Sequence, residues 1–164
     1  CDWSSDVCSS DLGIMPNNML GEADLLPHGF EAWAPGRRLA SMMAPTALDW
    51  GDGRCAMLGS GGSNRIRSAL ARAVLGLVDA GASLEDALAA PRLHVEAGEP
   101  PAVDFEEPGL PAADRAALLD AFPQARGWPE PSMFFGGVHG VMREAGGGVQ
   151  AAGDPRRDGH AIAV

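Results

Sequence analysis

Lysine and tyrosine are absent from the 164 residues, so every basic side chain other than histidine is arginine. A phosphate-binding loop of the Walker type needs a lysine directly after its last glycine, and Schiff-base chemistry needs a lysine amine. A tyrosine general acid is excluded in the same way. The sequence therefore rules out several common catalytic designs before any motif is considered.

Positive charge and long apolar runs are also scarce. Twelve arginines face 22 acidic residues, which gives a formal net charge of -10. Nucleic-acid binding needs clustered cations, a membrane span needs ~20 apolar residues, and the amino end lacks a signal-peptide pattern. We therefore expect no nucleic-acid partner and no membrane span, while the compartment in a bacterium stays open between periplasm, exterior and cytoplasm.

The first twelve residues, Cys1 to Leu12, differ in character from the rest of the chain. They are rich in Ser, Asp and Cys, show no helical or strand period, and resemble a translated sequencing-adapter remnant. We expect residues 1–12 to be a foreign leader and residues 13–164 to be the protein proper. Cys55 is then the one native cysteine, which makes a structural disulfide improbable.

The remaining length and a hydrophobic content of 46% predict one globular domain with a core. The pattern predicts helices from Ile66 to near Gly81, from Ser83 to Ala90 and over Ala112–Phe122. Glu96–Gly109, acidic and proline-rich, is predicted to be a surface connection. Two hairpins are predicted, Thr46–Trp50 with Arg54–Leu58 and Val138–Arg143 with Val149–Ala152. Together these elements predict an α+β layered domain.

A glycine-rich run, Leu58 to Ile66, lies between a predicted strand and the strongest predicted helix. Unpaired helix N-terminal N–H groups at such a place can bind an anion. The dinucleotide fingerprint fits poorly because Asn64 stands at its last glycine position, and neither Ser60 nor Ser63 has the flanking glycines of a nucleophile elbow. The run is either a set of backbone donors without a nucleophile or an ordinary strand-to-helix turn.

Metal ligation finds no support in the sequence, which leads us to expect no metal. The four histidines are far apart and lack cysteine or paired carboxylates nearby, so each is expected to be structural or solvated. They are His28, His94, His139 and His160.

Several short patterns occur in one fixed order along the chain. In sequence they are Gly13-Ile14, Asn17-Asn18, Pro35-Gly36-Arg37-Arg38, Ser41-Met42-Met43-Ala44-Pro45-Thr46, the Gly59–Ile66 run, Ala90-Pro91-Arg92-Leu93-His94 and Gly153-Asp154-Pro155-Arg156. As an ordered set they resemble the small subunit of γ-glutamyltransferase, also called glutathione hydrolase. The resemblance covers nearly everything from Gly13 to the end.

The resemblance implies a partial αββα sandwich of the N-terminal nucleophile hydrolase type. In that family a precursor cleaves itself, and the new amino-terminal threonine attacks the γ-glutamyl carbonyl with its own α-amine as base. The acyl group then passes to water or to an amino acid or peptide, and no cofactor or metal is needed. The implied substrate is glutathione or a related small γ-glutamyl compound.

The resemblance also assigns site residues. Gly62 and Ser63 would form the oxyanion hole through their backbone N–H groups, a contribution on the order of 3 to 4 kcal/mol per donor. Glu22 stands where an aspartate commonly pairs with the donor's α-ammonium, and Ser41 matches the first of two serines that hold its α-carboxylate. Met42 replaces the second serine and Met19 a frequent glutamine, so two polar contacts are lost.

The resemblance places the nucleophilic threonine upstream of Gly13 and a substrate-binding arginine in a separate large subunit, and this chain holds neither. We therefore expect the chain to be the C-terminal portion of the small subunit and inactive by itself. Two alternatives remain open. One is a related amidase acting on another acyl donor, such as a cephalosporin-type side chain, which Met19 and Met42 keep plausible. The other is a non-catalytic binding or assembly module.

Overall fold

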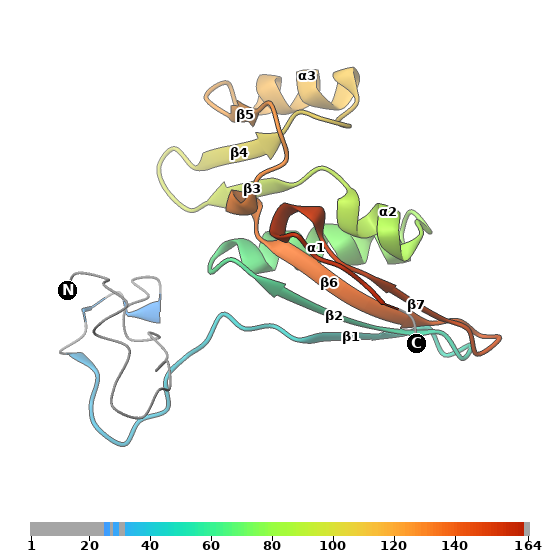
Figure 1. The fold of residues 1–164 in the computed structure, drawn as a ribbon. Coiled ribbons are helices and arrows are strands. Elements are labelled where there is room, and N and C mark those ends of the chain that lie inside the picture. The colour runs from blue at the N-terminus through green and yellow to red at the C-terminus, as the bar shows by residue number, and fades with distance from the viewer. Residues whose placement is uncertain (1–24, 27, 30–31, 163–164) are drawn as a thin grey trace. The chain divides into compact units, whose positions relative to one another are not determined.

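The computed structural model describes residues 25–26, 28–29 and 32–162. Contacts divide the chain into two units, Cys1–Ser41 and Met42–Val164. Every strand and α-helix among the described residues lies in the second unit (Figure 1). The account of the fold below therefore concerns that unit alone.

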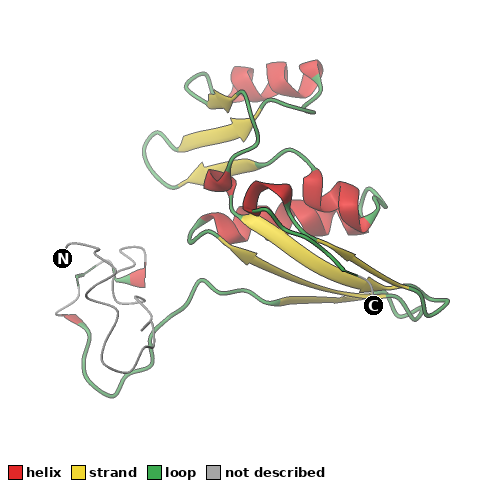
Figure 2. Cartoon of the chain, in the orientation of Figure 1, coloured by secondary structure: helices red, strands yellow, loops and turns green. Residues whose placement is uncertain are grey.

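A four-stranded antiparallel sheet forms the base of this unit (Figure 2). Its spatial order is β1-β2-β6-β7, made of β1 Thr46–Asp49, β2 Cys55–Gly61, β6 Gly137–Arg143 and β7 Val149–Ala152. β1 pairs with β2 and β6 with β7, which confirms both predicted hairpins. The central pair β2–β6 joins segments about 80 residues apart in sequence, a pairing that local patterns do not predict.

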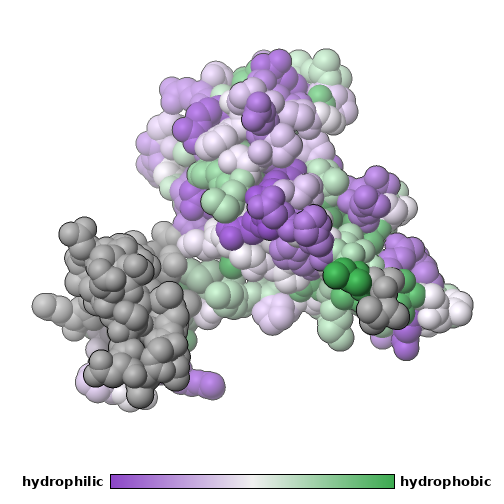
Figure 3. All heavy atoms as spheres, in the orientation of Figure 1, coloured by the Kyte–Doolittle hydropathy of each residue, from purple (hydrophilic) through white to green (hydrophobic). Residues whose placement is uncertain are grey.

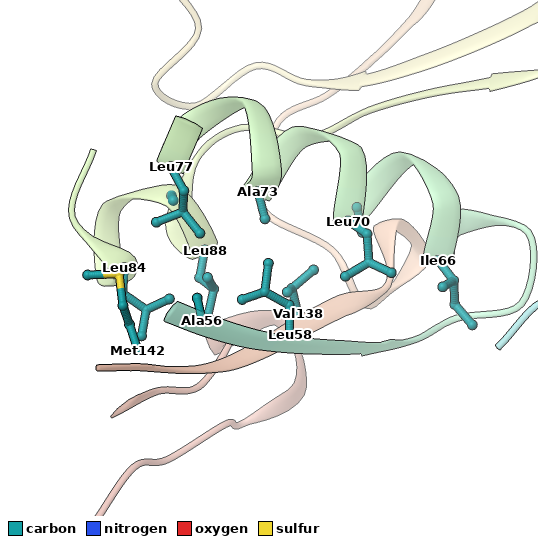
Figure 4. Close-up of a cluster of buried hydrophobic side chains, with 12 residues drawn as sticks. Ala56, Leu58, Ile66, Leu70, Ala73, Leu77, Leu84, Leu88, Val138 and Met142 are labelled. Carbon is teal, nitrogen blue, oxygen red and sulfur yellow. The ribbon is translucent and has the colours of Figure 1, made fainter. Parts of the chain in front are cut away.

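Two helices cover one face of this sheet and complete the main core. They are α1 Arg65–Val78 and α2 Leu84–Ala89, in good agreement with prediction. Ser83 caps α2, because its side chain accepts a hydrogen bond from the Asp86 N–H. In Figure 4, Leu70 of α1 points toward Leu58 of β2 and Val138 of β6, whereas Leu77 lies beside Leu84 and Leu88 of α2. The helical period of α1 thus corresponds to burial against the sheet.

A second, three-stranded sheet adjoins α1 through β3. It contains β3 Leu93–Glu96, β4 Ala102–Glu106 and the short β5 Arg126–Trp128, with β5 parallel to β4. The prediction of a surface connection over Glu96–Gly109 was wrong, since Val103, Phe105 and Glu106 are buried. The acidic composition misled it, because Glu106 is buried with an arginine partner.

Helix α3 Ala112–Ala121 forms where it was predicted. None of its residues is fully buried, and Phe122, which follows it, is 36% exposed. Cys55 is free and half-buried. Two short 3-10 turns, η5 Met133–Phe135 and η6 Pro155–Arg157, flank β6 and β7 and complete the unit.

The arrangement confirms the predicted α+β class. Within the described residues, no helix is long and apolar enough to cross a membrane.

Candidate active site

The glycine-rich run is half strand and half turn. β2 continues past the predicted end at Leu58 to Gly61, and Gly59, Ser60 and Gly61 pair with residues of β6. Small residues fit here because the backbone, rather than side chains, makes the contacts. The turn itself is therefore only the two residues after the strand, Gly62 and Ser63.

These two residues turn the chain directly into α1 with positive φ angles. Gly62 has φ +132° and Ser63 has φ +53°, a left-handed conformation that is uncommon for serine. The carbonyls of both accept the first turn's hydrogen bonds, from Arg65 N at 3.1 Å and Ile66 N at 3.0 Å. The loop N–H groups thus stand at the positive end of a 14-residue helix.

Close backbone contact with Gly136 fixes the position of the Gly62–Ser63 loop. A Cβ on Gly62 would lie 2.7 Å from the Gly136 Cα, and one on Gly136 would lie 2.8 Å from the Gly61 carbonyl oxygen. Real Cβ atoms do not approach that closely, so both positions require glycine. Gly136, which also has φ +76°, was not identified from the sequence.

A buried carboxylate, Asp154, ties β6 to the elements around the loop. Its Oδ2 accepts hydrogen bonds from the Val138 N–H and from Arg92 Nη2, both at 2.9 Å. Burial alone would raise the pKa of Asp154, but these bonds and those from Arg156 outweigh it and lower the pKa. Since Val138 neighbours Gly137, which pairs with Gly61, Asp154 holds the strand end that carries the loop.

A second buried pair extends the same network into the other sheet. Arg156 Nε donates to Glu106 Oε1 at 2.7 Å, and Arg156 also donates to the carbonyls that end α2. Burial would lower the pKa of Arg156, but Glu106 and Asp154 raise it overall. We name the set Arg92, Glu106, Asp154 and Arg156 the ion network.

A polar chain braces the first turn of α1 from the opposite side. Ser68 Oγ lies 2.8 Å from His94 Nδ1, and His94 Nε2 lies 2.9 Å from Glu96 Oε2. The hydrogen bond to His94 lowers the pKa of Glu96. Glu96 also accepts from Asn64 Nδ2 at 3.4 Å, directly after the loop. His94 is 2% exposed, and both of its ring nitrogens have a hydrogen-bond partner.

The structure locates the predicted site residues unevenly. Gly62 and Ser63 form one loop, whereas the methionine expected to face the donor, Met42, is half-buried and packs against the main core. Ser41 is exposed and belongs to the first unit. Glu22 and Met19 lie outside the described residues.

Three residues near the loop or its supporting network were not identified from the sequence. Gly136 and Arg157 lie against the loop, and Glu106 belongs to the ion network. The alternation of Val103, Phe105 and the polar residues between them could have indicated a strand, but no local signal marks a buried glutamate. Among the described residues, no group of three or more His, Cys, Asp or Glu side chains could hold a metal ion.

Comparison with known proteins shows to which family the chain that carries this loop belongs. The family model for gamma-glutamyltranspeptidase matches residues 2–164. The chain belongs to the gamma-glutamyltranspeptidase family. Curated relatives of this family member include an acylase ACY 1 proenzyme from Pseudomonas sp. strain SE83, 31% identical over 93% of this chain. A glutathione hydrolase proenzyme from Pseudomonas sp. strain A14 is 30% identical over the same share.

The chain spans about a quarter of the length of those relatives, 26% in both cases. The transpeptidase CapD from Bacillus anthracis is a similar solved structure, with a TM-score of 0.63, 28% identity and 79% of this chain and 75% of that chain covered. A gamma-glutamyltranspeptidase from Pseudomonas nitroreducens has a TM-score of 0.75 over 99% of this chain and 89% of that one, at 22% identity. These likenesses confirm the N-terminal nucleophile hydrolase fold.

Proposed function

We propose that this chain is the C-terminal part of the small subunit of an enzyme that transfers γ-glutamyl groups from glutathione or related compounds to water, amino acids or peptides. The observation that carries the proposal is the Gly62–Ser63 turn, two backbone N–H groups at a helix N-terminus, fixed by Gly136 and the ion network. Family membership over nearly the whole chain supports it.

In this proposal the Gly62 and Ser63 N–H groups stabilise the tetrahedral intermediate. A threonine oxygen, supplied by a segment outside these residues, attacks the γ-carbonyl carbon, and the carbonyl electron pair moves onto oxygen. The loop N–H groups hold that negative charge. The threonine's α-amine takes the hydroxyl proton and passes it to the leaving amine as the C–N bond breaks. Water or an acceptor amine then attacks the acyl-enzyme, and the threonine oxygen leaves with the attacker's proton. No side chain of the loop itself takes part.

The remaining segments of the enzyme would cover the open face of the four-stranded sheet. Opposite α1 and α2, Met57 is 66% exposed and Val141 49%. A sandwich fold places another sheet against such a face. We propose that the rest of the small subunit packs there, that a large subunit supplies further donor contacts, and that Ser41, Glu22, Met19 and Met42 have the donor-binding roles that the resemblance implies.

A second candidate function is acyl transfer from another donor, such as a cephalosporin side chain. Met42 supports it, because this side chain packs on the core and offers no hydrogen bond to an α-carboxylate. A relative named acylase ACY 1 proenzyme supports it as well. Each missing hydrogen bond to a charged group is worth about 1.5–3 kcal/mol, enough to change the preferred donor.

The decisive experiment uses the parental precursor. Its gene is read upstream for the expected threonine and for the natural sequence in place of residues 1–12, which we propose are a foreign leader. The purified precursor is then examined for self-cleavage and assayed with γ-glutamyl-p-nitroanilide and glutaryl-p-nitroanilide. We expect cleavage and faster turnover of the γ-glutamyl donor.

Faster turnover of the glutaryl donor would instead support the amidase. A parent without the threonine, folded but inactive on both donors, would mean a binding or assembly module. The matched control is this chain alone, for which we expect no turnover of either donor, since it holds the oxyanion loop without the proposed nucleophile.

A further inference from the structure

The side chain of Arg157 lies beside the Gly62–Ser63 turn, the oxyanion loop of the proposal. It reaches the turn by crossing glycines, which have no side chains. Its aliphatic stem crosses Gly137, where a Cβ would lie only 2.7 Å from the arginine Cδ. Its guanidinium ends at the loop: a Cβ on Gly61 would lie 3.6 Å from Nη1, and one on Gly62 would lie 3.5 Å from Nη2. Gly61 at the end of β2, Gly62 in the turn and Gly137 at the start of β6 thus leave room for this one side chain.

The position of Arg157 is fixed by its neighbours. Its N–H donates to the Asp154 carbonyl at 3.2 Å, and the preceding residue, Arg156, is locked in the ion network. Figure 3 shows hydrophilic residues gathered over the place where the dark red C-terminal turn lies in Figure 1. Arg157 is therefore anchored through its backbone, and the residue is exposed to solvent.

The charge of Arg157 differs from that of its neighbours in having no internal partner. Arg92 and Arg156 are buried and paired with Asp154 and Glu106. Arg157 is exposed, and within residues 25–26, 28–29 and 32–162 no carboxylate forms a salt bridge with it. A guanidinium at this place is available to negative charge that develops at the loop.

We propose that Arg157 is a positioning residue for the acyl-transfer reaction: its guanidinium supplies positive charge behind the Gly62–Ser63 turn and stabilises the oxyanion formed there. The inference rests on the proposed function. It applies to any acyl donor, because γ-glutamyl and glutaryl groups form the same tetrahedral oxyanion. A fixed cation beside developing charge lowers the barrier without needing to contact the substrate.

The test uses the parental precursor with R157M and R157K, assayed on whichever p-nitroanilide donor it turns over. Methionine keeps an unbranched apolar stem over Gly137 but removes the charge, and lysine restores a charge. We expect R157M to lower kcat about tenfold and to leave KM within about twofold of the parental value. This loss of kcat is smaller than the loss caused by removing an oxyanion-hole donor. R157K should recover part of the loss. R143M, an exposed arginine at the far end of β6, is the control and should match the parent.

A second measurement separates this role from simple packing. A boronic acid in place of the donor's γ-carboxyl group forms a tetrahedral anion at the loop, whereas glutamate binds as a ground-state ligand. R157M should weaken inhibition by the boronic acid about tenfold and leave inhibition by glutamate unchanged. Self-cleavage and the melting temperature of each variant are measured alongside.

The outcomes separate the inference from the function on which it rests. An R157M variant that folds, cleaves itself and keeps the parental kcat would overturn the inference alone. A raised KM at constant kcat would also overturn it, because the cation would then bind the ground state. A parent that turns over neither donor would overturn both the proposed function and the role of Arg157.

Discussion

The two faces of the four-stranded sheet are built from the same strands, but one face is buried under helices and the other is exposed. Along β2, Ala56 and Leu58 point beneath the helices and are 1% and 4% exposed, whereas Met57 between them is 66% exposed. β6 repeats the contrast with Met142, 8% exposed, and Val141, 49% exposed. Successive side chains of a β-strand point to opposite faces of the sheet, so each strand contributes residues to both the buried and the exposed face.

The contrast shows that apolar character alone does not place a residue in this unit's core. Met57 and Val141 are as hydrophobic as their buried neighbours, yet nothing among the described residues of the second unit buries them. The covered face is stabilised within the unit by α1, α2 and the ion network. The open face gains its stabilisation only if another segment packs on it.

The largest expected effect is removal of one buried charge from the covered side. R156M leaves Glu106 buried with only N–H partners, and loss of one partner of a buried pair costs about 3–5 kcal/mol. We expect the free energy of unfolding to fall by that amount in urea denaturation of this chain, followed by tryptophan fluorescence. The control is R126M, whose exposed arginine pairs with Asp104 and should cost under about 1 kcal/mol. Equal losses would contradict the contrast.

Next in size is a pair of substitutions at adjacent positions of β2. L58A removes a side chain that packs against α1 and should cost about 2–5 kcal/mol. M57A, one residue away on the open face, should change the free energy of unfolding of this chain by less than about 0.5 kcal/mol. The same urea titration measures both. A large loss for M57A would mean that the open face is already covered.

The sequence predicted the local elements of this fold well and the long-range ones poorly. Turn residues and helical periods predicted both hairpins, and α1 and α2 nearly to the residue, because these depend on neighbours in the chain. The β2–β6 pairing joins residues about 80 positions apart, and β4 pairs not only with the nearby β3 but also with β5, roughly 20 residues further along the chain. Glu106 shows the limit, since a buried glutamate becomes favourable only once Arg156 lies beside it.

The candidate site divides in the same way. The Gly62–Ser63 turn follows from small residues between a strand and a helix, so the sequence predicts it. Gly136 and Arg157 meet the loop only in the folded chain, and no local pattern marks either. The role that we propose for the loop rests on family resemblance rather than on residue spacing.

The ion network should also make the covered side sensitive to acid. The pKa of Asp154 is lower in the folded chain than its ordinary value of 3.8. Its contribution is therefore fully present above pH 3.8 and is lost as pH falls through the folded pKa. We expect D154N to flatten the loss of stability in urea titrations below pH 4. E144Q, at a half-buried carboxylate in the β6–β7 turn that accepts a hydrogen bond from Gln150, should leave that slope unchanged. An unaltered slope in D154N would place the acid sensitivity elsewhere.

The smallest effect on stability and activity is expected at Ser63, in the turn that follows the end of β2. S63G removes left-handed strain of roughly 1–2 kcal/mol but loses about 0.5–1 kcal/mol in chain entropy, so stability should change by less than about 1 kcal/mol. If only the Ser63 N–H serves the reaction, kcat of the parental enzyme should stay within about twofold. G62A, one residue earlier, is the matched contrast: its Cβ would meet the Gly136 Cα at 2.7 Å and displace the loop. A tenfold change in kcat for S63G would show that the serine hydroxyl takes part.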